Sequence, residues 1–304
     1  MRVLLLVPMA DGQTGPAIKH AFEQLGHKVD FVDAKIEPSA SFFTAEKFKP
    51  DLVFCSRTKK LTEQITLIKR TFKNTIICIW NVDSREDIRK WKRLYPLIRL
   101  SHYHFVVTHN LLPQWRQINP QTFWLPQGLQ SELYHRPYKI TEADRNKYEC
   151  DVCFCGHVDR HHAYRNQFMD AVRRMGIRFN LWQKGGIWGE RHNKMVALSK
   201  INLGCSGWIG ATRSVSVRSY KILGAGGFLL ERCRPGMNKL FPMSDSNRIL
   251  DCYESPQGLV DKIYYWLEHE QDRSQIAERG HKWVHEKATY THRMRMALGY
   301  MGMI

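Results

Sequence analysis

The feature that most constrains the fold is an alternation of short apolar strands with amphipathic helices, which runs through the chain twice. In the first run, apolar segments predict five strands, at residues 3–7, 29–32, 51–55, 75–80 and 104–108. Pro16 is suited to the start of a helix predicted at residues 17–25, and Ser84 begins a second helix predicted to end near Tyr95. Alternating strands and helices predict a mainly parallel sheet with helices on both faces.

A polar stretch at residues 136–149, rich in charge and poor in apolar residues, predicts a linker, after which the alternation restarts. The second run predicts strands at residues 150–155, 179–182, 201–204 and 228–231. It predicts helices at residues 164–175, 192–199, 216–225, 257–269 and 272–287, with a helical tail from Thr291. We therefore expect two α/β domains, residues 1–145 and 146–304, with a cleft between them at the carboxyl ends of the strands.

Charge is the most unusual part of the composition. Lys and Arg total 46 against 29 Asp and Glu, a formal net charge of +17. Such an excess favours a polyanionic partner, either nucleic acid or acidic lipid, although a basic surface without a particular partner remains the alternative. No apolar run approaches the roughly 20 residues that span a bilayer, and residues 1–8 are too short for a signal-peptide core. We expect a cytoplasmic enzyme without a transmembrane segment.

Eight cysteines raise the possibility of a metal site, because Cys150, Cys153, Cys155 and His157 lie close in sequence. The same segment alternates like a strand, and no second Cys-x-x-Cys pair completes a tetrahedral set of ligands. Buried reduced cysteine behaves as a small apolar residue. We therefore expect structural cysteines and no metal.

Two segments have the pattern of an anion site. Gly12 and Gly15 open a helix after the first strand, where backbone N–H groups favour an anion, but this turn lacks the dinucleotide-binding spacing. The segment 214–230 is more specific, because Ser214, Ser216 and Arg218 gather at a helix start and two glycines end that helix before a strand. Hydroxyls, a guanidinium and the helix dipole together favour a diphosphate.

From about residue 150 onward the sequence resembles the CgeB-like, spore-maturation-type glycosyltransferases. The resemblance is carried by the segments 151–156, 199–203, 218–230, 235–241, 276–280 and 289–293. It implies a GT-B fold, with two Rossmann-like domains facing each other across a cleft and a C-terminal helix that crosses back to the first domain. It also implies that the C-terminal domain binds a nucleotide sugar, such as a UDP-hexose, and the N-terminal domain the acceptor, without a required metal.

One position departs from the family pattern. The family usually has Glu after the aromatic residue of the Arg-x-aromatic-Glu segment, where it would hold the ribose hydroxyls, and this chain has Lys221. Because a cation cannot accept hydrogen bonds, either another acidic group holds the ribose or Lys221 meets phosphate. An inactive relative is the remaining alternative.

These arguments select two sets of site residues. The expected donor-binding residues are Gly12, Gly156, Arg165, Lys184, Ser214, Ser216, Arg218, Tyr220 and Lys221. A base for the acceptor hydroxyl is expected from Asp11, Asp83 or His109, which follow strands of the first domain. The alternative for Asp11 is a turn residue, and for Asp83 a helix-capping residue.

Basic residues near aromatic ones in the first domain suit a nucleic-acid surface. The expected DNA-binding residues are Arg57, Lys59, Lys60, Arg89, Lys90, Lys92 and Arg93, although a solvated helix face would have the same pattern. The resulting hypothesis is a phage enzyme, active in the host cytoplasm, that glycosylates 5-hydroxymethylpyrimidines in double-stranded DNA after flipping the base out. Two alternatives stay open: an envelope, spore-surface or protein acceptor with the basic face on an anionic membrane, and a non-catalytic nucleic-acid-binding relative.

Overall fold

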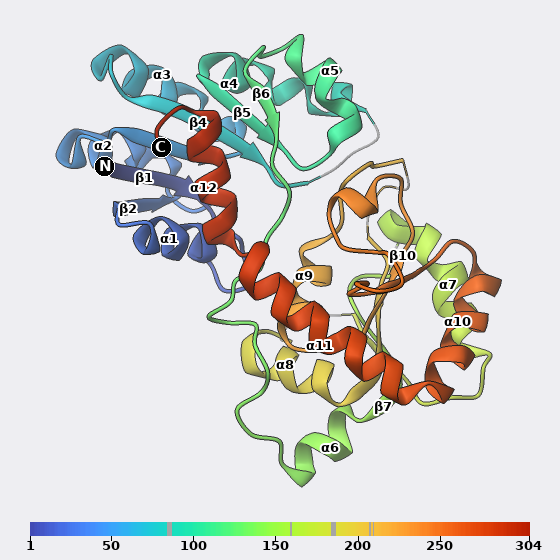
Figure 1. Cartoon of the computed structure of the whole chain (residues 1–304). Coiled ribbons are helices and arrows are strands. Elements are labelled where there is room, and N and C mark those ends of the chain that lie inside the picture. Colours follow the sequence, from blue (N-terminus) through green and yellow to red (C-terminus); the bar gives the residue numbers. More distant parts are fainter. Residues whose placement is uncertain (84–86, 159, 184–186, 207, 209) are drawn as a thin grey trace. The chain divides into compact units, whose positions relative to one another are not determined.

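The computed structural model of the chain describes residues 1–83, 87–158, 160–183, 187–206, 208 and 210–304 (Figure 1). The chain forms two compact units, and each is discontinuous in sequence. Unit 1 comprises Met1–Gln127, Gly210–Ser214 and Tyr290–Ile304, and unit 2 comprises Gly128–Ile209 and Val215–Thr289.

Unit 1 is built on a six-stranded parallel sheet with the strand order β2-β1-β3-β4-β5-β6. Its strands are β1 (Arg2–Val7), β2 (Lys28–Asp33), β3 (Leu52–Ser56), β4 (Ile76–Asn81), β5 (Tyr103–Val106) and β6 (Thr122–Trp124). Its α-helices are α1 (Gly15–Gln24), α2 (Ser41–Phe48), α3 (Thr62–Thr71), α4 (Tyr95–Leu100), α5 (Leu112–Arg116) and α12 (Tyr290–Tyr300). The five strands predicted from the first half of the sequence are all present.

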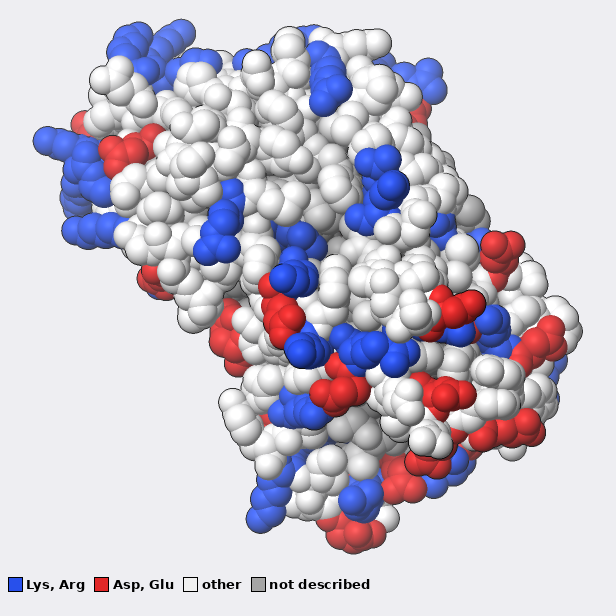
Figure 2. Space-filling model, viewed as in Figure 1, with Lys and Arg blue, Asp and Glu red and all other residues white. Residues whose placement is uncertain are grey.

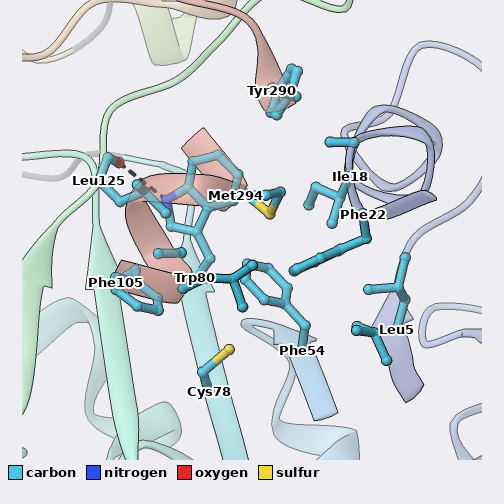
Figure 3. Close-up of a cluster of buried hydrophobic side chains, with 14 of the residues drawn as sticks. Leu5, Ile18, Phe22, Phe54, Cys78, Trp80, Phe105, Leu125, Tyr290 and Met294 are labelled. Carbon is cyan, nitrogen blue, oxygen red and sulfur yellow. Dashed lines mark hydrogen bonds between the residues drawn. The ribbon is translucent and has the colours of Figure 1, made fainter. Parts of the chain in front are cut away.

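The core of unit 1 joins the sheet, α1 and the C-terminal helix α12 (Figure 3). Phe22, Phe54 and Trp80 pack edge-on in series, and the Trp80 Nε1–H donates to the Leu125 carbonyl at 3.2 Å. Met294 of α12 is fully buried in the same cluster. The chain therefore ends in the unit where it began, which confirms the predicted return of the C-terminal helix.

Unit 2 is built on a five-stranded sheet with the order β11-β10-β9-β7-β8, in which every pairing is parallel. Its strands are β7 (Cys150–Cys155), β8 (Phe179–Trp182), β9 (Ser199–Gly204), β10 (Leu229–Arg232) and β11 (Asp251–Tyr253). Its α-helices are α6 (Glu142–Tyr148), α7 (Asn166–Arg173), α8 (Gly189–Ala197), α9 (Val217–Gly224), α10 (Pro256–Glu268) and α11 (Glu270–Lys287). The two parallel sheets confirm the predicted α/β class.

Two local predictions were wrong. The predicted linker contains α6, which begins with a capping box in which Thr141 and Asp144 satisfy each other's backbone N–H groups. Residues 88–94 form a 3-10 helix, η3 (Ile88–Leu94), instead of an α-helix, with Asp87 as its cap. Ile88, Trp91 and Leu94 are buried, and a spacing of three residues places them on one face of a 3-10 helix. No described helix is both long and apolar enough to cross a membrane.

Candidate functional site

A cavity opens in unit 2 at the carboxyl ends of β7 and β8, beside the amino end of α9. It encloses about 670 Å³ of empty space, part of which is open to solvent. Its lining residues are Cys155, Gly156, His157, Trp182, Gln183, Ile187, Trp188, His192, Ser216, Val217, Arg218 and Lys221. This edge of a parallel sheet is where α/β proteins bind ligands.

Arg218 is the central cation of the cavity. Its Nε–H donates to the Cys155 carbonyl, and its guanidinium lies 4.6 Å from the centre of the Phe154 ring. Its Nη1 is buried and has no hydrogen-bond partner among the residues that the structure describes. Gly156 leaves room for this group, because a Cβ there would come within 2.3 Å of Nη2. Arg218 is thus held firmly while part of its donor capacity stays available.

The amino end of α9 is fixed by a buried network. The Ser216 side chain caps the helix by accepting from the Arg218 N–H at 3.3 Å, and the Ser216 N–H donates to Ser206 Oγ at 2.8 Å. Ser206 Oγ and the Ser219 hydroxyl donate to the carboxylate of Glu231, which is fully buried. Three hydroxyls and one carboxylate therefore hold the helix start, with its free N–H groups, against the end of the sheet.

Lys221 lies one turn further along α9 and also lines the cavity. Its Nζ is 4.4 Å from the centre of the Tyr134 ring and 5.2 Å from that of Trp188, within cation–π range of both. Burial is the main cause that lowers the pKa of this ammonium to about 8; the Cys155 thiol opposes the shift, and the neighbouring Arg218 contributes to it. The cavity therefore holds two positively charged side chains at neutral pH.

His192 of α8 adds a neutral polar group to the wall. Burial, and secondarily Lys221 and Arg218, lower its pKa to about 3, so the imidazole is uncharged at neutral pH. Its ring packs edge-on against Tyr134, with centroids 5.2 Å apart. The positive charge of the cavity therefore comes from Arg218 and Lys221.

Four of the predicted donor-binding residues line the cavity together: Gly156, Ser216, Arg218 and Lys221. Arg165 instead lies buried behind them, with its Nε–H and Nη1–H donating to the carbonyls of Cys205 and His157. Tyr220 is buried against Phe241. Gly12 and Ser214 belong to unit 1, and Lys184 lies outside the described residues.

The three candidate bases follow strands of unit 1. Asp11 is exposed in the turn after β1, and Asp83, after β4, forms an ion pair with Arg57. His109, after β5, donates its backbone N–H to the Thr212 carbonyl, and its ring lies 6.1 Å from that of Trp124. Burial, with smaller contributions from Arg213 and Arg116, lowers the pKa of His109, so its imidazole is neutral at neutral pH.

The predicted DNA-binding residues form a basic patch on unit 1: Arg57, Lys59, Lys60, Arg89, Lys90, Lys92 and Arg93. They follow the carboxyl ends of the neighbouring strands β3 and β4. Arg57 connects the two segments, because it pairs with Asp83 and its guanidinium lies 4.3 Å from the ring of Trp91. The other six side chains are exposed, although Arg89 also pairs with Asp87 at 2.7 Å.

The charge of the chain is concentrated in unit 1. This unit has 22 Lys and Arg against 11 Asp and Glu, so it carries +11 of the net +17. Figure 2 shows Lys and Arg side chains that project around α3 on the face viewed. The electrostatic feature noted in the sequence is therefore a property mainly of unit 1.

Sequence reasoning missed the aromatic residues of the site, which are Trp182 and Trp188 in the cavity lining and the buried Tyr134 beside Lys221. Tyr134, Trp182 and Trp188 lie far apart along the chain from Arg218, and each could be an ordinary core residue when read alone. Trp182 at the end of a predicted strand was the one available signal. Within the described residues, no three His, Cys, Asp or Glu side chains are grouped as metal ligands would be.

Comparison with known proteins supports the assignment of the fold. Residues 160–299 match the model of a family described as glycosyl transferase-like. The structure of Anabaena Alr3699/HepE in complex with UDP-glucose is similar over 100% of both chains, with a TM-score of 0.69 and 10% identity. The structure of the same Anabaena protein in complex with UDP has a TM-score of 0.66 and 12% identity, again over 100% of both chains. No curated protein matches the chain.

The glycosyltransferase from Rickettsia africae ESF-5 is similar over 99% of this chain and 98% of its own, with a TM-score of 0.64 and 11% identity. At such low identity, these similarities define the fold, which is GT-B. The family match over the second half of the chain supports glycosyltransferase activity.

Proposed function

We propose that this chain transfers a sugar from a UDP-sugar, bound in the cavity of unit 2, to a hydroxyl group of an acceptor. The observation that carries the proposal is the buried Arg218, whose Nη1 has no partner among the described residues and which lines a cavity at the capped start of α9. A guanidinium and free helix N–H groups suit a diphosphate. Trp182 and Trp188 offer ring faces on which a nucleobase can stack.

The chemistry requires charge stabilisation and a proton acceptor. The bond between the anomeric carbon and the phosphate oxygen breaks, the acceptor oxygen bonds to that carbon, and the hydroxyl proton passes to a base. Arg218 and Lys221 would neutralise the leaving diphosphate. We propose His109 as the base, because its imidazole is neutral at neutral pH, whereas Asp83 is held in an ion pair and Asp11 is exposed in a turn.

For the acceptor we propose a polyanion, specifically a 5-hydroxymethylpyrimidine in double-stranded DNA, as in a phage DNA-modifying member of the CgeB-like group. The support is the basic patch and the +11 charge of unit 1. Phosphate contacts from such a patch would hold a duplex irrespective of sequence. The target base would have to leave the stack to react.

The test is to incubate the protein with hydroxymethylated duplex DNA and UDP-hexoses, digest the DNA, and measure nucleoside masses. We expect a hexose-sized mass gain on one nucleoside, and its loss in Arg218→Ala. Donor hydrolysis without a gain would direct the search to envelope, spore-surface or protein acceptors. Absence of both gain and hydrolysis with every nucleotide sugar would contradict the enzyme and favour the non-catalytic alternative.

The basic patch is tested by a matched pair of double variants. Lys92→Gln with Arg93→Gln removes two exposed charges from the patch. Arg70→Gln with Lys73→Gln removes two exposed charges outside it, one in the last turn of α3 and one in the loop that follows. If both patch residues meet phosphates, the slope of log affinity against log salt should fall by about 2 in the first variant. The slope should stay unchanged in the Arg70→Gln, Lys73→Gln variant. Equal changes of slope in the two double variants would show that only the total charge matters.

A further inference from the structure

Lys221 is held in the cavity by aromatic rings. Its Nζ lies over Tyr134 and Trp188, and no described residue forms a salt bridge with it. Glu190, the acidic residue of α8, instead accepts the Tyr138 N–H at 3.1 Å. The ammonium is therefore desolvated without an ionic partner, a state that an incoming anion would relieve.

The described residues that line the cavity include no Asp or Glu. The side-chain acceptors of the lining include Ser216, whose Oγ already accepts the Arg218 N–H, and the neutral Gln183 and His192. A hydrogen bond between neutral groups changes an affinity by about tenfold or less. The cavity is thus well supplied with groups that bind phosphate and poorly supplied with groups that bind ribose hydroxyls.

The two cations match the two negative charges of a nucleoside diphosphate sugar. We infer that Lys221 is a specificity-determining residue that pairs with a donor phosphate; this inference rests on the proposed function. The cavity then recognises the diphosphate and the base of the donor but not its ribose 2′-hydroxyl. The cavity should then bind 2′-deoxyribonucleoside diphosphates about as well as UDP. The lowered pKa of Lys221 agrees with an ammonium that lacks its counter-ion in the free protein.

The experiment measures the affinity of the full chain for UDP, 2′-deoxy-UDP and UMP by titration calorimetry. We expect UDP and 2′-deoxy-UDP to bind within about threefold of each other, and UMP much more weakly. Lys221→Gln should reduce the preference for UDP over UMP by tenfold or more, and Lys221→Arg should largely restore it. Lys139→Gln, an exposed lysine of unit 2, is the matched control and should change nothing.

Two outcomes would overturn the inference about Lys221 and leave the proposed function in place. One is tight UDP binding with a preference of tenfold or more over 2′-deoxy-UDP, and the other is an unchanged UDP-to-UMP ratio in Lys221→Gln. If the expected ratios hold but no sugar is transferred to any acceptor, the proposed activity fails and the inference stands. If no nucleotide binds at all, both fail.

Discussion

At the scale of single residues, the two cations of the cavity are restrained in different ways. Arg218 is held by the Cys155 carbonyl and the Phe154 ring, which fix its direction, and its charge persists at any ordinary pH. Lys221 is surrounded by rings and carries a proton that burial makes easier to lose. If both residues bind the donor diphosphate as proposed, Lys221 and not Arg218 makes the affinity depend on pH near pH 8.

We predict that UDP affinity falls about tenfold per pH unit above pH 8, since neutral Lys221 cannot pair with phosphate. The groups that face Lys221 do not titrate near this pH: Arg218 stays charged, His192 is already neutral, and burial raises the pKa values of Cys155 and Tyr134. The terminal phosphate of UDP is fully ionised well below pH 8. Calorimetry between pH 7 and pH 10 measures the effect.

The control for this prediction is Lys221→Arg, whose UDP affinity should stay constant over the same pH range.

The folding stability of the free protein should change with pH in the opposite direction to the UDP affinity. Because the folded pKa of Lys221 is about 8 and its ordinary value is 10.5, the unfolded chain binds more protons between these values. This residue therefore makes the free fold more stable as pH rises from 8 to 10.5. If the UDP affinity of the wild type did not change between pH 7 and pH 10, the assignment of phosphate binding to Lys221 would be contradicted.

At the scale of elements, α9 is positioned chiefly by Glu231. Four donors converge on its two carboxylate oxygens: the N–H and Oγ–H of Ser206, the Ser219 hydroxyl and the Arg232 N–H. Gly204 makes space for this carboxylate, because a Cβ there would lie 2.1 Å from its oxygen. Ser206 in turn accepts the Ser216 N–H, so the carboxylate positions the start of α9, where the donor diphosphate is proposed to bind, through Ser206 and Ser216.

We predict that Glu231→Gln weakens UDP binding several-fold and costs about 1–3 kcal/mol of stability, because an amide has only one accepting oxygen for these donors. Glu254→Gln changes an exposed carboxyl that follows β11 and serves as the control. Thermal unfolding and UDP titration of both variants provide the comparison. Loss of stability with unchanged UDP affinity would mean that Glu231 only packs the sheet.

The elements show where sequence reasoning succeeds and fails. The central strands β1, β3 and β4 were predictable because strands inside a parallel sheet are buried on both faces, so their residues form continuous apolar runs. The linker prediction missed α6, although Thr141 and Asp144 form a recognisable capping box. The α9 part of the site was predictable because Ser216, Arg218 and Lys221 lie in one segment, whereas Tyr134 and Trp188 reach it only through tertiary folding.

At the scale of the whole molecule, the chain is divided so that unit 1 depends on the last residues of the sequence. Tyr290, Met294 and Leu298 recur at intervals of four residues, so one face of α12 enters the core against α1. Tyr290 also donates its hydroxyl to Gln127, and Arg293 Nε–H donates to the Gln127 carbonyl. The first unit is therefore completed only after the second has been synthesised.

We predict that Leu298→Ala destabilises unit 1 by about 2–5 kcal/mol, since it empties space in a core where Leu298 is fully buried. Hydrogen exchange followed by mass spectrometry should show faster opening of β1 and α1, with β7 and β9 unchanged. Arg295→Ala, at an exposed position of the same helix, controls for helix propensity and should leave exchange unaffected. Equal loss of protection in both sheets would show that the units unfold together, and unchanged exchange in β1 and α1 would contradict the dependence of unit 1 on α12.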